Sequence, residues 1–137
     1  MPRFVLLRHV VPTGSPRGSH WDVMLEQGDA LATWAIERLP LAWADMLGET
    51  AAASDDSCEA LELPAHRLAY LDYQGPVSGD RGEVTRCDRG EFTVLTWSPV
   101  LIEVELQGEK LTGRARLTKA GEQGAVWRLT ATPPTRG

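Results

Sequence analysis

The chain has 137 residues, of which 42% are hydrophobic and 24% charged, and its formal net charge is −5. This length suffices for one domain with its own core, and this composition is typical of a globular protein. We expect a single domain over residues 1–132 and a flexible tail over 133–137. An acidic chain lacks the basic surface that sequence-independent coating of nucleic acid requires, although it can still carry a local basic groove.

The N-terminus and the cysteines give no sign of export or membrane insertion. The first apolar run, Phe4 to Leu7, is too short for a signal peptide or a membrane span. Cys58 and Cys87 lack the close spacing of metal-binding cysteine pairs, so we interpret both as reduced packing or surface residues. These features predict a cytoplasmic protein without a membrane-spanning segment.

Hydrophobic patterning in the first half of the chain predicts a β-hairpin followed by one helix. The expected strands cover Arg3–Val10, His20–Glu26, Ala30–Ile36 and Cys58–Leu63, with a turn at Gln27-Gly28-Asp29. Leu41–Leu47 has helix-forming composition between Pro40 and Gly48 and is the only good helix candidate. Residues 11–19 and 49–57 are rich in small or polar residues and are predicted to be loops, the second one mobile.

The second half has the pattern of a β-meander, in which short strands alternate with turn signals. The expected strands are Gly82–Cys87, Glu91–Trp97, Leu101–Gln107, Lys110–Lys119 and Ala125–Thr132. The turns between them are Asp88-Arg89-Gly90, Ser98-Pro99, Gly108-Glu109 and Gly121–Gly124. Strands this short and this closely spaced indicate a small β-barrel or β-sandwich.

The three histidines of the chain stand near other residues that bind metals or move protons. They are His9, His20 with Asp22 two residues later, and His66 with Tyr70 four residues later. Residues two apart on a strand point to the same face, so His20 and Asp22 are expected to converge. Two imidazoles and a carboxylate make an open divalent-metal site with positions left for water or substrate. The alternative is that each histidine is an ordinary surface or hydrogen-bonded residue.

His66 and Tyr70 could lie together on a helical turn or in a loop beside that site. His66 could then donate or accept a proton, and Tyr70 could donate a hydrogen bond to a phosphate oxygen. The alternative is a histidine at the end of a strand and a buried tyrosine. The five tryptophans lie on or next to predicted elements, which favours core packing over stacking on bases.

Charged residues on two neighbouring predicted strands favour a structural role. Glu103 and Glu105 alternate on one strand, and Arg114 and Arg116 alternate on the next. Across the turn between the strands, these residues are expected to form cross-strand ion pairs on a solvated face. The sequence has no Gly-rich nucleotide loop, nucleophile elbow, Cys-x-x-Cys pair or His-Glu-x-x-His helix.

Five segments, taken in order, carry a family pattern: RFVLLRH, HWDVMLE, LATWAI, HRLAYLDYQGPVSGDRGEV and CDRGEF. Together they resemble the 3′-phosphoesterase domain found at the N-terminus of many bacterial ligase D proteins of non-homologous end joining. This domain also occurs as a small stand-alone protein. The resemblance extends over residues 3–118.

The resemblance implies a small closed antiparallel β-barrel, with one or two short helices, that trims the 3′ ends of DNA or RNA. Members of the family remove a terminal 3′-ribonucleoside and then the remaining 3′-phosphate, using Mn²⁺ or a similar divalent ion such as Zn²⁺. The implied partners are nucleic-acid 3′ ends and a ligase or polymerase of end joining. The implied site comprises metal ligands His9, His20 and Asp22, catalytic His66, Tyr70 on a phosphate oxygen, and Glu26 in a supporting acidic position.

The chain departs from the family where phosphate is bound. The family strand reads His-Tyr-Asp-Phe-Arg-Leu-Glu, so Met24 stands in place of its phosphate-binding Arg. Leu7 replaces a family Gln, and a second family Arg aligns near Cys58. An Arg held against a phosphoryl group stabilises charge developing in the transition state, and losing such a group commonly costs about 10²–10³ in rate.

A dianionic 3′-phosphate depends on such an Arg more than a diester does. We therefore expect weak or absent phosphomonoesterase activity unless another Arg substitutes. Candidates near the matched motifs are Arg8, Arg17, Arg67 and Arg81.

Three functions follow from these patterns. The first is a metal-dependent phosphoesterase that acts on nucleic-acid 3′ ends. The second is a module that keeps the metal and binds phosphorylated ends or a repair partner without turnover, which the loss of Arg at position 24 favours. The third is a structural or small-molecule barrel without phosphate chemistry, which predicts no role for the histidines.

Overall fold

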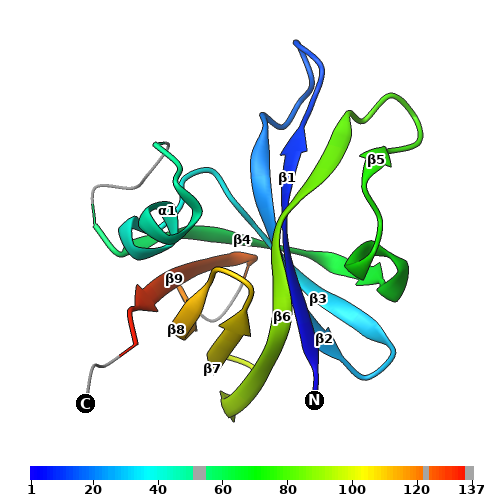
Figure 1. The fold of residues 1–137 in the computed structure, drawn as a ribbon. Coiled ribbons are helices and arrows are strands. Elements are labelled where there is room, and N and C mark those ends of the chain that lie inside the picture. The colour runs from blue at the N-terminus through cyan, green and yellow to red at the C-terminus, as the bar shows by residue number, and fades with distance from the viewer. Residues whose placement is uncertain (51–54, 122–123, 135–137) are drawn as a thin grey trace.

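The computed structural model describes residues 1–50, 55–121 and 124–134, and it is mainly β, as the sequence predicts. Its strands form one antiparallel sheet in the order β1-β2-β3-β4-β9-β8-β7-β6-β5, and β1 also pairs with β6. This additional pairing closes eight strands of the described chain into a barrel and leaves β5 outside the ring (Figure 1). The predicted closed antiparallel β-barrel is therefore confirmed.

The described chain contains nine strands and two short helical segments. The strands are β1 (Arg3–Val10), β2 (His20–Gln27), β3 (Ala30–Ile36), β4 (Ser57–Arg67), β5 (Gly75–Pro76), β6 (Glu83–Trp97), β7 (Leu101–Gly108), β8 (Thr112–Lys119) and β9 (Val126–Thr132). The helical segments are α1 (Leu41–Leu47) and the 3₁₀ turn η1 (Leu68–Leu71). The predicted loop over 49–57, the turn over Gly121–Gly124 and the tail over 133–137 each include residues outside the described ranges. No helix of the described chain is long and apolar enough to cross a membrane.

β1 and β2 bury both of their faces. Their inward side chains join a core cluster with members from all eight barrel strands, including Phe4, Leu6, Trp21, Val23, Leu25, Trp34, Ala60, Phe92, Ile102, Ala115 and Trp127. Their outward side chains form a smaller apolar cluster with residues of β3, η1 and β6: Val5, Leu7, Met24, Leu31, Leu71 and Val84. The outer face of this hairpin is therefore covered, and polar residues on it can be buried.

Helix α1 occupies the predicted range and closes off part of the barrel core. Trp43 and Ala44 are buried in the interior cluster. The Ala42 N–H donates to the Asp56 carboxylate, which satisfies one of the free donors at the start of the helix. Gly48 ends the helix in the left-handed conformation, with φ of 71°, where glycine is the favoured residue.

The predicted turn at Asp88-Arg89-Gly90 is wrong, because β6 runs through these residues without a break. β6 pairs with β1 on one side and with β7 on the other. The buried Asp88 carboxylate accepts hydrogen bonds from the backbone N–H groups of Lys110 and Leu111, between β7 and β8. A Cβ on Gly90 would clash with a carbonyl oxygen of β7. The Asp and the Gly therefore serve burial and close strand approach, not a turn.

β4 continues past its predicted end, because Pro64 does not terminate it. The pairing between β3 and β4 is irregular at Pro64 and Ala65, which form a β-bulge. Proline has no N–H to donate, so a bulge is one of the few places where a strand tolerates it. The bulge places His66 near the end of β4, just before η1.

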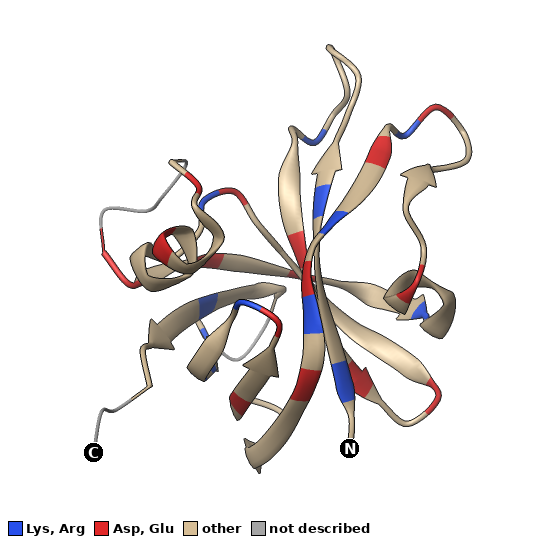
Figure 2. Ribbon diagram, in the orientation of Figure 1, with Lys and Arg blue, Asp and Glu red and all other residues tan. Residues whose placement is uncertain are grey.

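Charged residues on β7 and β8 face one another across the sheet. Glu103 faces Arg116 across β7 and β8 and forms the predicted ion pair, of 3.4 Å. Glu105 faces Arg114 in the same register, but these two form no ion pair within the described residues. Figure 2 shows acidic and basic residues interspersed over the barrel strands. Both cysteines are free, and burial raises the pKa of the Cys58 thiol to about 12, so this thiol is a poor nucleophile.

Candidate metal and phosphate site

The register between β1 and β2 brings the first two histidines together. His9, near the end of β1, lies directly opposite His20 at the start of β2, and their ring centroids are 4.9 Å apart. Asp22 lies two residues further along β2, on the same face as His20. One ligand atom from each of these three residues lies within 4.8 Å of the others. The convergence expected from strand alternation is present, and His9 completes it.

Backbone carbonyl groups fix the orientation of both imidazole rings. His9 Nε2 lies 2.6 Å from the carbonyl oxygen of Arg81, and His20 Nδ1 lies 2.8 Å from that of Gly18. A carbonyl oxygen can only accept, so these two ring nitrogens carry the hydrogens. The other nitrogen of each ring, Nδ1 of His9 and Nε2 of His20, faces the Asp22 carboxylate. In a neutral ring this nitrogen carries a lone pair and no hydrogen. Metal-binding histidines are commonly anchored in this way.

The three side chains interact strongly with one another. His9 Nδ1 lies 3.6 Å from Asp22 Oδ2, and His20 Nε2 lies 3.1 Å from Asp22 Oδ1. Burial alone would raise the pKa of Asp22, but the close approach of His20 and His9 outweighs it and lowers this pKa to about 2. The same carboxylate, against the opposing effect of burial, raises the pKa of His9. Asp22 is therefore ionised at neutral pH although it is almost completely buried.

The donor set fits a divalent metal ion. Asp22 Oδ1 is buried and forms no hydrogen bond within the described residues, despite its closeness to His20 Nε2. Two neutral imidazole lone pairs facing an ionised carboxylate are unfavourable unless a proton or a cation lies between them. Two nitrogens and a carboxylate oxygen suit Mn²⁺, Zn²⁺ and related ions and leave coordination positions open. These residues could hold such an ion, with the open positions facing a cleft.

His66 and Tyr70 line the same cleft as the three converging residues. The cleft has a volume of about 780 Å³ and lies between the β1–β2 loop, the end of β4, η1 and the β5–β6 connection. The rings of His66 and Tyr70 pack edge to face, with centroids 5.5 Å apart. Neither of the two structural alternatives predicted from sequence holds alone, because His66 lies near the end of β4 while Tyr70 lies on the 3₁₀ turn η1. Both side chains are half-buried at the cleft.

The β-bulge in β4 determines how His66 is presented. His66 Nδ1 lies 2.9 Å from the carbonyl oxygen of Pro64, so Nδ1 carries the hydrogen. In the neutral ring, Nε2 then has a free lone pair. Bulges beside active sites often reorient a side chain in this manner. The tautomer of His66 is suited to accepting a proton or attacking an electrophile with Nε2.

Three of the four candidate arginines lie at the cleft. Arg17, Arg67 and Arg81 line it. The Arg81 guanidinium is held by Ser78, since its Nε donates to the Ser78 carbonyl oxygen at 2.7 Å. Arg8 instead lies over the Trp21 ring, 4.0 Å from the ring centroid, on the face that carries the barrel core. Arg8 therefore cannot take the place of the missing phosphate-binding Arg at this cleft.

The two departures from the family pattern belong to one apolar cluster. Leu7 pairs directly with Asp22, and Met24 pairs with Val5, so all four share the outer face of the hairpin. Leu7 and Met24 are almost fully buried, and Met24 also lines the cleft. Where the family pattern has a Gln and an Arg, this chain therefore has an apolar floor beside the converging residues.

Glu26 is not brought to the site. Its carboxylate accepts hydrogen bonds from the backbone N–H and the guanidinium of Arg3, at the opposite end of β2 from His20. Glu26 lies six positions along the extended strand from His20, which corresponds to about 20 Å. Glu26, which the resemblance implies as a supporting acidic residue, is therefore paired with Arg3 away from the cleft.

Sequence reasoning also missed two groups that matter here, the carbonyl groups of Gly18 and Arg81. Every residue has a backbone carbonyl group, so a sequence does not indicate which of these groups approach a site. An indirect signal exists at Gly82, whose φ is 92° and where a Cβ would clash with the Val10 carbonyl oxygen. This glycine permits the close approach that brings the Arg81 carbonyl to His9.

The fold and the cleft define a small β-barrel with a histidine–aspartate cluster suited to phosphate chemistry. The sequence profile of the family described as DNA Ligase D 3'-phosphoesterase domain matches residues 14–119. This match covers most of the chain, so the protein belongs to that family. The matched range includes His20, Asp22, His66 and Tyr70, whereas His9 lies before it. A search among curated proteins gave no match.

Proposed function

We propose that the protein is a divalent-metal-dependent phosphoesterase that trims the 3′ ends of DNA or RNA during end repair. The observation that carries this proposal is the convergence of His9, His20, Asp22 and His66 on one cleft in a member of the 3′-phosphoesterase family. The proposed metal ligands are the first three residues. The ion, Mn²⁺ or a similar one such as Zn²⁺, would neutralise phosphate charge and polarise phosphorus.

His66 and Tyr70 are proposed to act on the scissile phosphate. Tyr70 would donate its hydroxyl hydrogen to a phosphate oxygen and so hold the group in place. His66 would either attack phosphorus through Nε2 or, when protonated, give a proton to the leaving oxygen. The hydrogen bond from His66 Nδ1 to Pro64 supports the first role, because it leaves the Nε2 lone pair free in the neutral ring.

The apolar floor supports a preference for diesters over monoesters. Met24 and Leu7 provide no donor for the extra charge of a terminal phosphate. Arg17 and Arg67 line the cleft, and neither forms an ion pair within the described residues, so they are the proposed phosphate contacts. They reach the cleft from its rim and replace the missing Arg only in part. Removal of a terminal ribonucleoside should therefore be faster than removal of the 3′-phosphate.

The proposed substrates, cellular compartment and partner enzymes follow from membership of the family. The substrates would be DNA or RNA 3′ ends in the cytoplasm, made ready for a ligase or polymerase of end joining. An acidic protein with a few arginines at one cleft fits an enzyme that recognises ends better than one that coats duplexes.

The test is a trimming assay on 5′-labelled primer–templates. One primer ends in a single ribonucleotide and another in a 3′-phosphate, each with Mn²⁺, Zn²⁺ or EDTA. We expect metal-dependent loss of the ribonucleoside, with product accumulating as the 3′-phosphate. His20→Ala should abolish this activity while the fold survives, whereas Glu103→Gln, on β7 and outside the lining of the cleft, should leave it unchanged. Full turnover by His20→Ala would contradict the site assignment.

A second function shares the same site. The replacement of Arg by Met24 favours a module that retains the metal and binds phosphorylated ends without cleaving them. Metal-dependent binding to a 3′-phosphate end, with no product from either primer after long incubation, would support the binding module and contradict the enzyme.

A further inference from the structure

The apolar floor of the proposed catalytic cleft extends beyond Leu7 and Met24. Val84 of β6 lines the cleft and belongs to the same apolar cluster on the outer face of the hairpin. Tyr70 of η1 and Val77 of the β5–β6 connection also line the cleft, and both are half-buried and pack against that cluster. The floor therefore consists of side chains from several separate parts of the fold, held together by one apolar cluster.

The charged residues at this cleft lie at its rim. Apart from the buried Asp22, the charged residues that line it are all exposed: Arg17, Arg67, Asp80 and Arg81. Met24 and Val84, by contrast, are buried, and their side chains offer no hydrogen-bond donor. A polar group that reached them would lose its hydrogen bonds to water without gaining new ones, which is costly. The cleft therefore favours anionic groups at the rim or at the metal ligands, and an apolar group on the floor.

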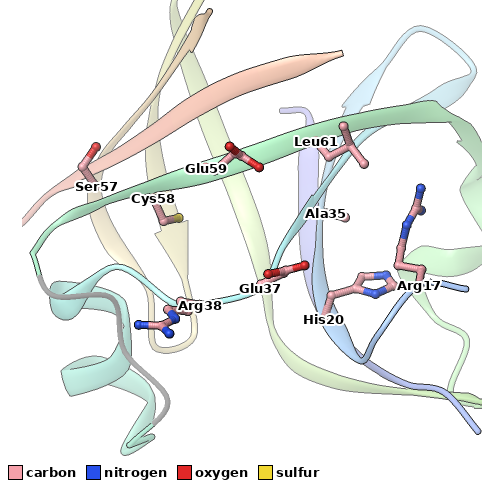
Figure 3. Close-up of a pocket in the computed structure, with 9 residues that line it drawn as sticks. All are labelled: Arg17, His20, Ala35, Glu37, Arg38, Ser57, Cys58, Glu59 and Leu61. Carbon is pink, nitrogen blue, oxygen red and sulfur yellow. The ribbon is translucent and has the colours of Figure 1, made fainter. Parts of the chain in front are cut away.

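A smaller cleft next to the His9–His20–Asp22 cluster lacks such a floor. It has a volume of about 290 Å³ and shares Arg17 and His20 with the larger one. Figure 3 shows charged side chains of both signs around it, from Arg17, Glu37, Arg38 and Glu59. Within the described part of the chain, none of its lining residues belongs to or packs against the outer apolar cluster. An apolar group bound beside the metal ligands is therefore better placed in the larger cleft.

The floor begins directly beside the proposed metal ligands. Val84 lies opposite His9 in the pairing of β1 with β6. Met24 follows Asp22 by two positions on the same face of β2, which corresponds to about 7 Å. An aromatic ring joined through one oxygen to a phosphate at the cluster spans a distance of this order. A ring of the leaving group can therefore reach the floor while its phosphate stays at the proposed metal ligands.

A plain aromatic ring fits this floor better than a nucleobase. Nucleobases carry hydrogen-bond donors and acceptors on their edges, and these groups would be left unpaired against apolar side chains. A phenyl ring has no such groups. It can also extend the edge-to-face packing of Tyr70, whose ring centroid lies 5.5 Å from that of His66 and 5.8 Å from that of Tyr73.

We propose that the protein also cleaves 3′-phosphodiesters whose leaving group carries an aromatic ring, such as the phenol side chain of a tyrosine, and that this ring packs on the apolar floor. This inference rests on the proposed function and extends its substrate class. The scissile phosphate lies at the His9–His20–Asp22 cluster, and the arginines at the rim hold the upstream nucleic-acid strand. The floor then determines which leaving group is preferred.

The proposed reaction is a hydrolysis that consumes one water molecule. The bond between phosphorus and the oxygen of the aromatic group breaks, and this oxygen leaves with the bonding electrons and takes up a proton. The oxygen of the water molecule becomes bonded to phosphorus, either directly or after a phosphorus–nitrogen bond to His66 has formed and been hydrolysed. The products are a nucleic-acid 3′-phosphate and a free phenol or aromatic alcohol, so no oxidant or other reactant is required.

The test compares three primers of one sequence that differ only in the group esterified to the 3′-phosphate: ethanol, benzyl alcohol, or the tyrosine side chain of a short peptide. Ethanol and benzyl alcohol are leaving groups of similar acidity, so this pair isolates the effect of the ring. With Mn²⁺ present, we expect the benzyl primer to be favoured over the ethyl primer by about tenfold or more in kcat/KM, because the ring is removed from water. Equal rates for these two primers would overturn the proposal.

The tyrosyl primer distinguishes two sources of the aromatic group. A preference for the benzyl primer together with cleavage of the tyrosyl primer would support the proposal for ends joined to a protein. A preference for the benzyl primer without cleavage of the tyrosyl primer would support it for small aromatic groups.

Floor variants that keep the shape of the side chain and change its polarity provide a second test. Val77→Thr/Val84→Thr should lower the preference for the benzyl primer at least about threefold, because each hydroxyl makes the floor polar. Val77→Thr alone, at a half-buried position in the β5–β6 connection, should lower it in the same direction and keeps the test valid if the double variant unfolds. Val94→Thr is the matched control, since Val94 lies on β6 but is exposed and does not line the cleft. An unchanged preference in folded floor variants would overturn the proposal.

A binding measurement separates this inference from the proposed function. Benzylphosphonate and ethylphosphonate, which are not hydrolysed, are titrated with Zn²⁺ present into the unmodified protein and Val77→Thr/Val84→Thr, and binding is followed by NMR. Stronger binding of benzylphosphonate, weakened in the variant, would support the aromatic site even if no primer were cleaved. Trimming of a terminal ribonucleoside without any preference for the benzyl group, in binding or in cleavage, would leave the enzyme standing and overturn the aromatic site.

Discussion

The inner and outer faces of the β1–β2 hairpin are both buried, but they are built for different tasks. The inner face is apolar where it joins the barrel core, as with Phe4, Leu6 and Trp21. The outer face is apolar over Val5, Leu7 and Met24, and then becomes polar at His9, His20 and Asp22. The same strands therefore supply the packing that holds the barrel together and the cluster proposed to bind metal.

The difference between the inner and outer faces of the hairpin shows how a small barrel can contain a buried charged site. Unpaired buried charges are costly, so the outer face surrounds Asp22 with two histidines that are themselves held by carbonyl groups. The inner face needs no such arrangement, since apolar side chains only have to fill space. Changes on the inner face should therefore affect stability, whereas changes at the polar end of the outer face should affect chemistry.

The largest effect is expected from His9→Ala. Loss of a proposed metal ligand should reduce trimming at least about 10³-fold, because a bound ion contributes several kcal/mol to charge stabilisation. The side chain lies at the edge of the cleft and not in the barrel core, so the circular-dichroism spectrum should keep its β form. Steady-state trimming rates measure this loss, with Glu103→Gln as the control. A rate within a factor of about two of the unmodified protein would exclude His9 from the site.

Leu6→Ala should produce the reverse pattern. This fully buried side chain lies on the inner face, next in sequence to Leu7 on the outer face. Truncation should lower the free energy of unfolding by about 2–5 kcal/mol through lost burial and a residual cavity. Trimming per folded molecule should be retained. Urea denaturation and trimming rates together check this expectation, and a loss of activity without a loss of stability would contradict the division between the two faces.

Asp22→Asn should reveal the coupling between the buried carboxylate and the histidines in metal-free protein. The lowered pKa of Asp22, about 2, stabilises the fold above the ordinary carboxyl pKa near 4, and this contribution is lost as pH falls through about 2. The raised pKa of His9 stabilises the fold below its ordinary value, and that contribution is lost as pH rises through the raised pKa. The unmodified protein should exceed the variant in unfolding free energy by about 2 kcal/mol between these limits.

The measurement is urea denaturation in EDTA at a series of pH values. The difference between the unmodified protein and Asp22→Asn should be largest near pH 4–6, following the two limits above. A difference that stays constant from pH 2 to pH 8 would show that the carboxylate and the histidines are not coupled.

The smallest of these effects is expected from Gly82→Ala. This substitution tests whether the hydrogen bond from His9 Nε2 to the Arg81 carbonyl contributes to metal binding. A Cβ there would clash with the Val10 carbonyl oxygen, so the Arg81 carbonyl should move away from His9. Losing such an anchoring group typically weakens metal affinity about 10–100-fold. Gly14→Ala is a matched control, because Gly14 has a similar φ of 88° but no neighbouring atom within 4 Å of an added Cβ. Equal Mn²⁺ affinities of the two variants would contradict the anchoring role.

The sequence predicted the local elements well, because one buried face gives a strand a clear alternating pattern. β1, β3 and α1 have the predicted bounds, and β2 is one residue longer than predicted. The convergence of His20 and Asp22 follows from the same alternation. The inclusion of His9 depends on the register between β1 and β2, which alternation alone does not determine.

The misassigned features depend on contacts between segments far apart in the chain. Asp88 and Gly90 have the composition of a turn, but long-range contacts with β7 and the β7–β8 connection make them part of a strand. Pro64 normally ends a strand, yet the bulge in β4 accommodates it and positions His66. Met24 stands where the family pattern has an Arg, and its burial depends on a long-range contact, because Leu71 of η1 packs over the outer face of the hairpin.

Binding of a metal ion by His9, His20 and Asp22 can be measured directly. Isothermal titration calorimetry with Mn²⁺ should be performed on the metal-free protein and on Asp22→Ala, with Glu103→Gln as the control. We predict one equivalent of Mn²⁺ for the unmodified protein and the control, and no measurable binding for Asp22→Ala. Equal binding by Asp22→Ala, or no binding by the unmodified protein, would contradict the proposed metal site and the phosphoesterase mechanism built on it.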